Sequence, residues 1–136
     1  MTSAIKLKIP RQRPYHGVAR LVVGGLAARL DFSYESLEDL QLALASILEQ
    51  DAYMLEPEVT VELDVGDDVL AMVVGPLNGD ELRSDLEERG DDQIGLGRLL
   101  GTLAETVAVE KREDGDWLRL EKEIRAIRPE GSHEGV

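Results

Sequence analysis

The sequence predicts an α+β fold: a two-layer sandwich in which three main helices cover one face of a mostly antiparallel, mixed β-sheet of about five strands. Two observations predict this class. Segments with alternating apolar residues come in pairs joined by tight turns, which favours antiparallel neighbours. Other segments place apolar residues at every third or fourth position, so each forms a helix that needs one face buried.

Length and composition indicate a single domain over residues 1–136. We expect an ordered core at about residues 4–126 and a flexible tail at residues 127–136, where Pro and Gly are frequent. The chain has no Cys, no apolar run long enough to span a membrane and no signal-peptide pattern. These absences predict a cytoplasmic protein without a membrane partner.

Charge is distributed unevenly along the chain. The net charge of −13 argues against direct binding of nucleic acid, because phosphate backbones attract basic surfaces. Residues 1–30 nevertheless carry six Lys and Arg and no acid. Two interpretations stay open: an uneven solvated surface, or a basic face that docks an acidic protein surface.

The first half of the chain predicts one strand and two helices. Residues 4–9 alternate apolar residues with Lys, as expected for a half-buried strand. Residues 15–30 predict a helix whose apolar stripe consists of Val18, Leu21, Val22, Leu26 and Leu30. Ser36 and Asp39 resemble a capping box at the start of a second helix, which runs to about residue 51. The core stripe of that helix consists of Leu37, Leu40, Leu44, Ile47 and Leu48.

The second half predicts two hairpins separated by a long connection and a helix. The predicted strands are residues 58–65, 69–74, 106–112 and 117–124. Asp114-Gly115 is a strong signal for the turn of the second hairpin. Residues 76–94 contain seven acids and two Arg, and we expect a lid-like loop in which Leu82 and Leu86 support one or two helical turns.

Gly95-Leu96-Gly97 opens the third predicted helix, which runs to about residue 105. Glycines at a helix start let backbone N–H groups face a ligand, and the positive end of the helix dipole points at the same spot. This arrangement suits phosphate, and the same pattern also makes a tight helix entry with no ligand. Arg98 either meets an anion there or lies on the surface of the first turn.

With these elements in this order, the chain resembles the bacterial anti-sigma regulatory factors. These are small serine kinases built on the ATP-binding domain that histidine kinases and gyrase share. The resemblance covers roughly residues 4–126 and implies a histidine-kinase-like ATPase fold. It rests on the Ile-Pro end of the first strand, Ala19-Arg20-Leu21, residues 38–44, and Gly95-Leu96-Gly97 with the helix and hairpin that follow.

The resemblance also identifies departures at the catalytic positions. Active members carry Glu-x-x-x-Asn on the second helix, with the Glu as base or positioning group and the Asn as Mg²⁺ ligand. The matching residues are Ser46 and Gln50. A Ser hydroxyl is no base near neutral pH, and Gln holds its carbonyl on a longer arm. We therefore expect these degenerate positions to leave no catalytic residue and no metal site.

The adenine motif of the family, Asp-x-Gly-x-Gly, corresponds to residues 75–79, where Gly75 replaces the Asp and Gly79 remains. Asn78 could offer a hydrogen bond, but it stands three residues from the position of the Asp. The candidate nucleotide-binding residues are Gly79, Gly95, Leu96 and Gly97. The acids of residues 76–94 would repel the phosphates of ATP. At an effective dielectric constant near 20, two like charges ~6 Å apart repel by ~3 kcal/mol. We expect no cofactor; ATP and Mg²⁺ would bind only if the site still functions.

The resemblance implies two functions. The first is a non-catalytic regulator that binds a sigma factor or an antagonist (anti-anti-sigma) protein through Arg20, which matches the Arg that the family uses to grip partners, and that could form a homodimer. The alternative is an active ATP-dependent protein serine kinase of the same family, with Glu49 and Asp51 as the nearest replacement groups. A third interpretation keeps only the fold and assigns the domain to another signalling complex.

Overall fold

The computed structural model describes residues 3–87 and 96–123. Its strands are β1 (Ser3–Pro10), β2 (Glu58–Val65), β3 (Val69–Leu77), β4 (Thr106–Arg112) and β5 (Gly115–Glu123). They form one sheet in the order β1-β2-β3-β5-β4. The predicted α+β sandwich is confirmed. Each neighbouring pair of these strands is antiparallel, so the described sheet is not mixed as predicted.

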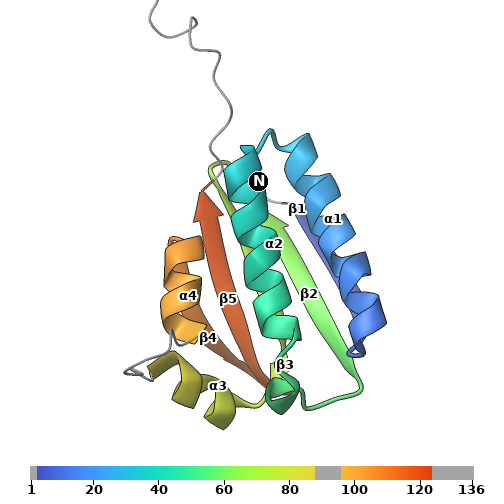
Figure 1. The fold of residues 1–136 in the computed structure, drawn as a ribbon, viewed down its shortest axis with the longest axis vertical. Coiled ribbons are helices and arrows are strands. Elements are labelled where there is room, and N and C mark those ends of the chain that lie inside the picture. The colour runs from blue at the N-terminus through green and yellow to red at the C-terminus, as the bar shows by residue number, and fades with distance from the viewer. Residues whose placement is uncertain (1–2, 88–95, 124–136) are drawn as a thin grey trace, which may run out of the picture.

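The helices lie together on one face of the sheet (Figure 1). The α-helices are α1 (His16–Arg29), α2 (Tyr34–Leu48), α3 (Gly79–Glu87) and α4 (Leu96–Leu103), and the short 3-10 helices are η1 (Arg13–Tyr15) and η2 (Asp51–Tyr53). None of the helices in the described ranges has the length and apolar character needed to cross a membrane. The opposite face of the sheet carries no helix in this part of the chain.

The core lies between α2 and the sheet. Of the predicted α2 stripe, Leu40, Leu44, Ile47 and Leu48 are buried and Leu37 is half-buried against them. The strands bury the following residues against this stripe: Val59, Val61, Leu63, Leu70, Met72, Val74, Leu118 and Leu120. The period of the apolar residues therefore predicted the buried faces of α2 and of the strands correctly.

α1 buries part of the predicted stripe, since Val22, Leu26 and Leu30 pack half-buried against the core. Its fully buried residues are Ala19, Val23 and Ala27, whereas Val18 and Leu21 are 43% and 76% exposed. The prediction followed the large apolar residues. Small Ala side chains let α1 approach its neighbours closely, so the helix turns its alanine stripe inward and leaves Val18 and Leu21 on the surface.

α2 begins and ends earlier than predicted. Its N-cap is Ser33, whose hydroxyl accepts a hydrogen bond from the backbone N–H of Ser36 at 3.1 Å. The predicted capping box at Ser36 is therefore wrong, since Ser36 lies buried in the first turn. The helix ends at Leu48, so Gln50 lies beyond it.

Part of the predicted lid-like loop is strand and helix. β3 continues to Leu77, and α3 follows at Gly79–Glu87. Asn78 caps α3, because its Oδ1 accepts hydrogen bonds from the N–H groups of Asp80 and Glu81 at 3.1 and 3.3 Å. An Asn followed by acids, with Leu82 and Leu86 four residues apart, was the signal for this helix. Residues 88–95 and the predicted tail at residues 127–136 lie outside the described residues.

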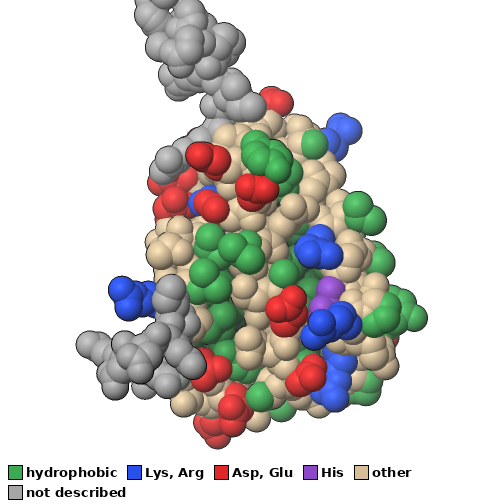
Figure 2. Space-filling model, in the orientation of Figure 1, with side chains coloured by type: hydrophobic (Ala, Val, Ile, Leu, Met, Phe, Trp, Pro, Cys, Tyr) green, Lys and Arg blue, Asp and Glu red, His purple; other side chains and the backbone are tan. Residues whose placement is uncertain are grey.

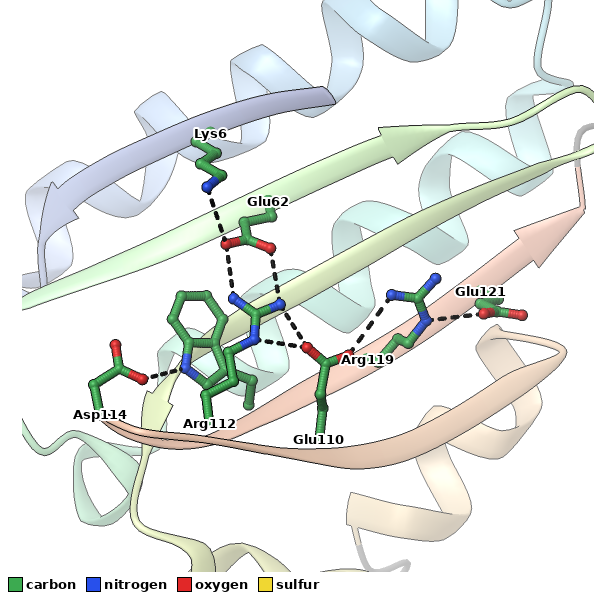
Figure 3. Close-up of polar contacts among 8 residues, drawn as sticks. Lys6, Glu62, Glu110, Arg112, Asp114, Arg119 and Glu121 are labelled. Atoms are coloured by element: carbon green, nitrogen blue, oxygen red, sulfur yellow. Dashed lines mark hydrogen bonds and ion pairs between the residues drawn. The ribbon is translucent and has the colours of Figure 1, made fainter. Parts of the chain in front are cut away.

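The helix-free face of the sheet carries a network of paired charges (Figure 3). Two guanidinium nitrogens of Arg112 donate to the two carboxylate oxygens of Glu62 at 2.8 and 3.0 Å, and its Nε donates to Glu110 at 2.6 Å. These hydrogen bonds hold the pKa of Glu62 below its ordinary value. The guanidinium also lies 4.0 Å from the centroid of the Trp117 ring.

Candidate functional site

Ser46 and Gln50, the two positions that match the catalytic residues of the family, do not share a helix face. The Ser46 hydroxyl donates to the backbone carbonyl of Leu42 at 2.8 Å, one turn back along α2. Gln50 is exposed and lies between α2 and η2. The alternative groups Glu49 and Asp51 line a separate cavity of about 370 Å³ together with Arg11, Gln12, Arg13 and His16. They therefore face the cationic start of α1.

α3 packs against η2, α4 and β5, in the region where the resemblance implies a nucleotide. Tyr53 of η2 is fully buried, and its hydroxyl donates to the Asp85 carboxylate of α3 at 2.5 Å. Burial is the main cause that raises the pKa of Tyr53, and the hydrogen bond to Asp85 raises it further, so the phenol stays a neutral donor. Leu82 of α3 is also fully buried. Sequence reasoning missed this contact, because Tyr53 and Asp85 are 32 residues apart.

Replacing Tyr53 by Phe should loosen α3. The variant loses a hydrogen bond to a charged group, so we expect the free energy of unfolding to fall by about 2 kcal/mol. Amides of α3 should also exchange faster with deuterium, which mass spectrometry measures. Tyr15→Phe is the matched control, since Tyr15 is 44% exposed and its change should stay within about 0.5 kcal/mol. Equal effects in both variants would contradict the assigned role of Tyr53.

At two candidate nucleotide-binding glycines an added Cβ would meet other parts of the chain. A Cβ on Gly97 would lie 2.5 Å from the carbonyl oxygen of Leu86, at the end of α3. A Cβ on Gly79 would lie 2.8 Å from Nη1 of Arg83, whose guanidinium pairs with Asp116 of β5. Of the other two candidates, Leu96 is half-buried against the core and Gly95 lies outside the described residues.

Gly75 lies at the position that matches the adenine-binding Asp of the family. It is buried in β3, and an added Cβ would lie 2.5 Å from Cγ of Trp117. Trp117 lines the helix-free face together with Lys6 and Glu62, and its indole N–H donates to Asp114 at 2.8 Å. A side chain at position 75 would therefore point away from α2 and from Ser46.

Arg20, the predicted partner contact, lies in an open groove between α1 and α2. The groove has a volume of about 680 Å³ and is lined by Pro14, Gly17, Val18, Arg20, Leu21, Gln41, Leu42 and Ala45. Gln41 ties the two helices together, since its side-chain amide donates to the Arg20 carbonyl at 3.0 Å. Figure 2 shows exposed hydrophobic side chains with Lys and Arg beside them on the α1 side of the molecule.

The basic first 30 residues do not form one face. Lys6 and Lys8 of β1 lie on the helix-free face of the sheet, 3.9 Å from Glu62 and Glu58 respectively. Arg20 lies on the helical side. The interpretation as a single basic docking face is therefore wrong, because the Lys and Arg of this stretch are divided between the two faces of the sheet.

Two bacterial proteins similar to this chain carry the same name. The serine-protein kinase RsbW of Bacillus subtilis (strain 168) is 30% identical over 122 residues, which cover 79% of this chain and 76% of that protein. The protein of the same name from Oceanobacillus iheyensis is 48% identical over 44 residues, which cover 32% of this chain and 28% of that protein. No profile of a known protein family matches the chain.

A solved structure shares the fold. The crystal structure of the RsbU and RsbW domains of Rv1364c from Mycobacterium tuberculosis matches with a TM-score of 0.60 at 14% identity, over 93% of this chain and 34% of that chain. The relatives resemble this chain in sequence as well. For the Bacillus subtilis protein this similarity covers most of both chains. The chain belongs to the RsbW family of anti-sigma regulatory factors, whose domain has the histidine-kinase-like ATPase fold.

Proposed function

We propose that this protein is a non-catalytic regulator that binds a sigma factor or its antagonist protein through the groove between α1 and α2. The observation that carries this proposal is the position of Arg20, which lies exposed in a groove with large apolar side chains beside it. A sigma factor acts on RNA polymerase, so the proposal places the protein in the cytoplasm. The names of the relatives make kinase activity the alternative to be tested.

The region around Ser46 supports a role without phosphoryl transfer. That reaction depends on Mg²⁺ and on a group that positions the attacking hydroxyl. Ser46 bonds to its own helix, and Gln50 lies outside α2. Gly79 and Gly97 are accounted for by packing against β5 and α3.

Charge reversal at Arg20 should weaken partner binding at least tenfold, because it places a carboxylate where an acidic partner docks. The binding of purified sigma factors and antagonist proteins from the same cell, measured by biolayer interferometry, checks this. Arg98→Glu is the matched control, since Arg98 is also an exposed helical Arg and lies on α4. The same mixtures with Mg·ATP should yield no phosphoserine in the antagonist.

Two results would contradict the proposal. If every partner still binds the Arg20→Glu variant but no longer binds the Arg98→Glu variant, the partner surface lies elsewhere. If the protein phosphorylates the antagonist at a rate that depends on Ser46 or Gln50, it is an active kinase.

A further inference from the structure

We infer that the cavity between the start of α1 and the end of α2 binds a small zwitterion of the α-amino acid class. Arg11 and Arg13 would pair with its carboxylate. Glu49 and Asp51 would pair with its ammonium group. The inference goes beyond the proposed function, because the ligand is a small molecule and the site is a different one. The residues that line this cavity and those that line the groove between α1 and α2 do not overlap.

The first argument is that the cavity gathers charges of both signs that do not pair with each other. Its volume is about 370 Å³, and its lining includes Arg11, Arg13, Glu49 and Asp51. In the part of the chain that the structure describes, no ion pair joins these cations to these carboxylates. Arg11 donates to the backbone carbonyl of Met54 at 3.5 Å, which is a neutral group. The four charges can therefore pair with a ligand without breaking an ion pair among the described residues.

The second argument is His16, the first residue of α1, which is the buried member of the cavity lining. It is 8% exposed, and its Nε2 lies 3.0 Å from the backbone oxygen of Arg11. A carbonyl oxygen only accepts, so Nε2 carries the proton and Nδ1 of the neutral ring is an acceptor. Within residues 3–87 and 96–123, Nδ1 has no hydrogen-bond partner. Since buried polar atoms normally have one, an ammonium group in the cavity would supply it.

The third argument is the direction of the two helices. The start of α1 and the end of α2 lie at the same end of the sandwich (Figure 1). The N-terminal end of a helix attracts anions, and the C-terminal end attracts cations. A carboxylate near the start of α1 and an ammonium group near the end of α2 therefore match the helix dipoles as well as the side chains.

Charge and size select a zwitterion over other small ligands. Phosphate would be attracted by Arg11 and Arg13 but repelled by the two carboxylates, and a metal cation would meet the reverse. A molecule with both charges satisfies all four groups. The cavity volume of about 370 Å³ is at the small end of ligand sites, which span about 300–1,000 Å³. An amino acid fits this volume better than a nucleotide does.

The test measures the melting temperature of the full chain with each standard amino acid at about 10 mM. At least one should raise it by several degrees, as expected for a ligand far above its Kd. In calorimetry, Arg13→Gln and Glu49→Gln should each weaken the binding of that amino acid at least tenfold. Both side chains are exposed, so the variants without ligand should melt as the wild type does. Arg98→Gln and Glu113→Gln, at exposed residues outside the cavity lining, are the matched controls and should bind normally.

Two derivatives of the selected amino acid separate its charges. The N-acetyl form lacks the ammonium group and should bind the wild type at least tenfold more weakly than the parent does. Glu49→Gln should reduce this difference, because the carboxylate that distinguishes the two forms has been removed. The carboxamide form lacks the carboxylate, and its difference from the parent should shrink in Arg13→Gln in the same way.

Three results would overturn the inference. One is a screen in which no amino acid changes the melting temperature. Another is unchanged affinity in both Arg13→Gln and Glu49→Gln, which would place the ligand elsewhere. The third is inorganic phosphate that stabilises the protein as strongly as the amino acid does, which would make the cavity an anion site. The proposed function stands or falls separately, since its partner assay contains no amino acid.

Discussion

Replacing Gly75 by Asp, the residue that the family uses to bind adenine, should destabilise the protein by at least about 4 kcal/mol. The new side chain would begin 2.5 Å from Cγ of Trp117 and would carry a carboxylate into a buried part of β3. Either the indole or the strand must move. Urea unfolding measures the loss of stability. The fluorescence emission of Trp117, the single Trp of the sequence, reports the displacement of its ring.

A double-mutant cycle identifies the cause of this loss. Gly75→Ala alone should be strongly destabilising, and Trp117→Leu should remove much of that penalty because a smaller side chain leaves room for the Cβ. If the losses of unfolding free energy in the two single variants simply add in the double variant, the clash with Trp117 is not the cause of the destabilisation. An Asp variant with wild-type stability and unchanged Trp emission would contradict the placement of position 75 on the helix-free face.

Replacing Gly97 by Ala should destabilise the protein by about 2 kcal/mol, although Ala normally favours a helix. The added Cβ would lie 2.5 Å from the carbonyl oxygen of Leu86 and 3.0 Å from its Cα. These are backbone atoms, so α3 and α4 must separate to make room. Thermal unfolding gives the change in stability, and hydrogen exchange shows whether α3 loosens first.

Gly101→Ala provides the control for Gly97→Ala within the same helix. No heavy atom lies within 4 Å of a Cβ at Gly101, so this variant should gain up to about 1 kcal/mol. If the Gly97 variant is also stabilised, then α3 does not pack on the start of α4 as described.

The sheet and its order of elements could be predicted because each signal is local. Alternation with period two identified the strands, and Asp114-Gly115 predicted the second hairpin. The structure confirms that hairpin, in which Gly115 has a φ of 143°. Only Gly adopts such a backbone conformation at no steric cost.

The orientation of α1 could not be read from its pattern. Large apolar residues and small ones compete for the buried face, and the outcome depends on how closely α2 and the sheet approach. Ala19, Val23 and Ala27 are buried, and Leu21 became part of the candidate groove. Of the predicted stripe, Val18 and Leu21 stay exposed, whereas Val22, Leu26 and Leu30 pack half-buried against the core.

The positions of the candidate site came from the resemblance. It selected Arg20, Ser46 and Gln50, but it says nothing of where their side chains lie. The contacts of Tyr53 with Asp85, Gly97 with Leu86, and Gly75 with Trp117 join residues that are distant in sequence. No periodicity reports such contacts, so only the folded structure reveals the packing requirements of these glycines.

Titration with Mg·ATP tests most directly whether this protein works without nucleotide. A ligand at 100 times its Kd stabilises a protein by about 2.7 kcal/mol, which raises the melting temperature of a domain of this size by several degrees. With Mg·ATP at millimolar concentration we expect a change of less than about 1 °C, both for the wild type and for Ser46→Glu. A saturable rise of about 5 °C or more, enlarged in Ser46→Glu, would show a working nucleotide site and contradict the account.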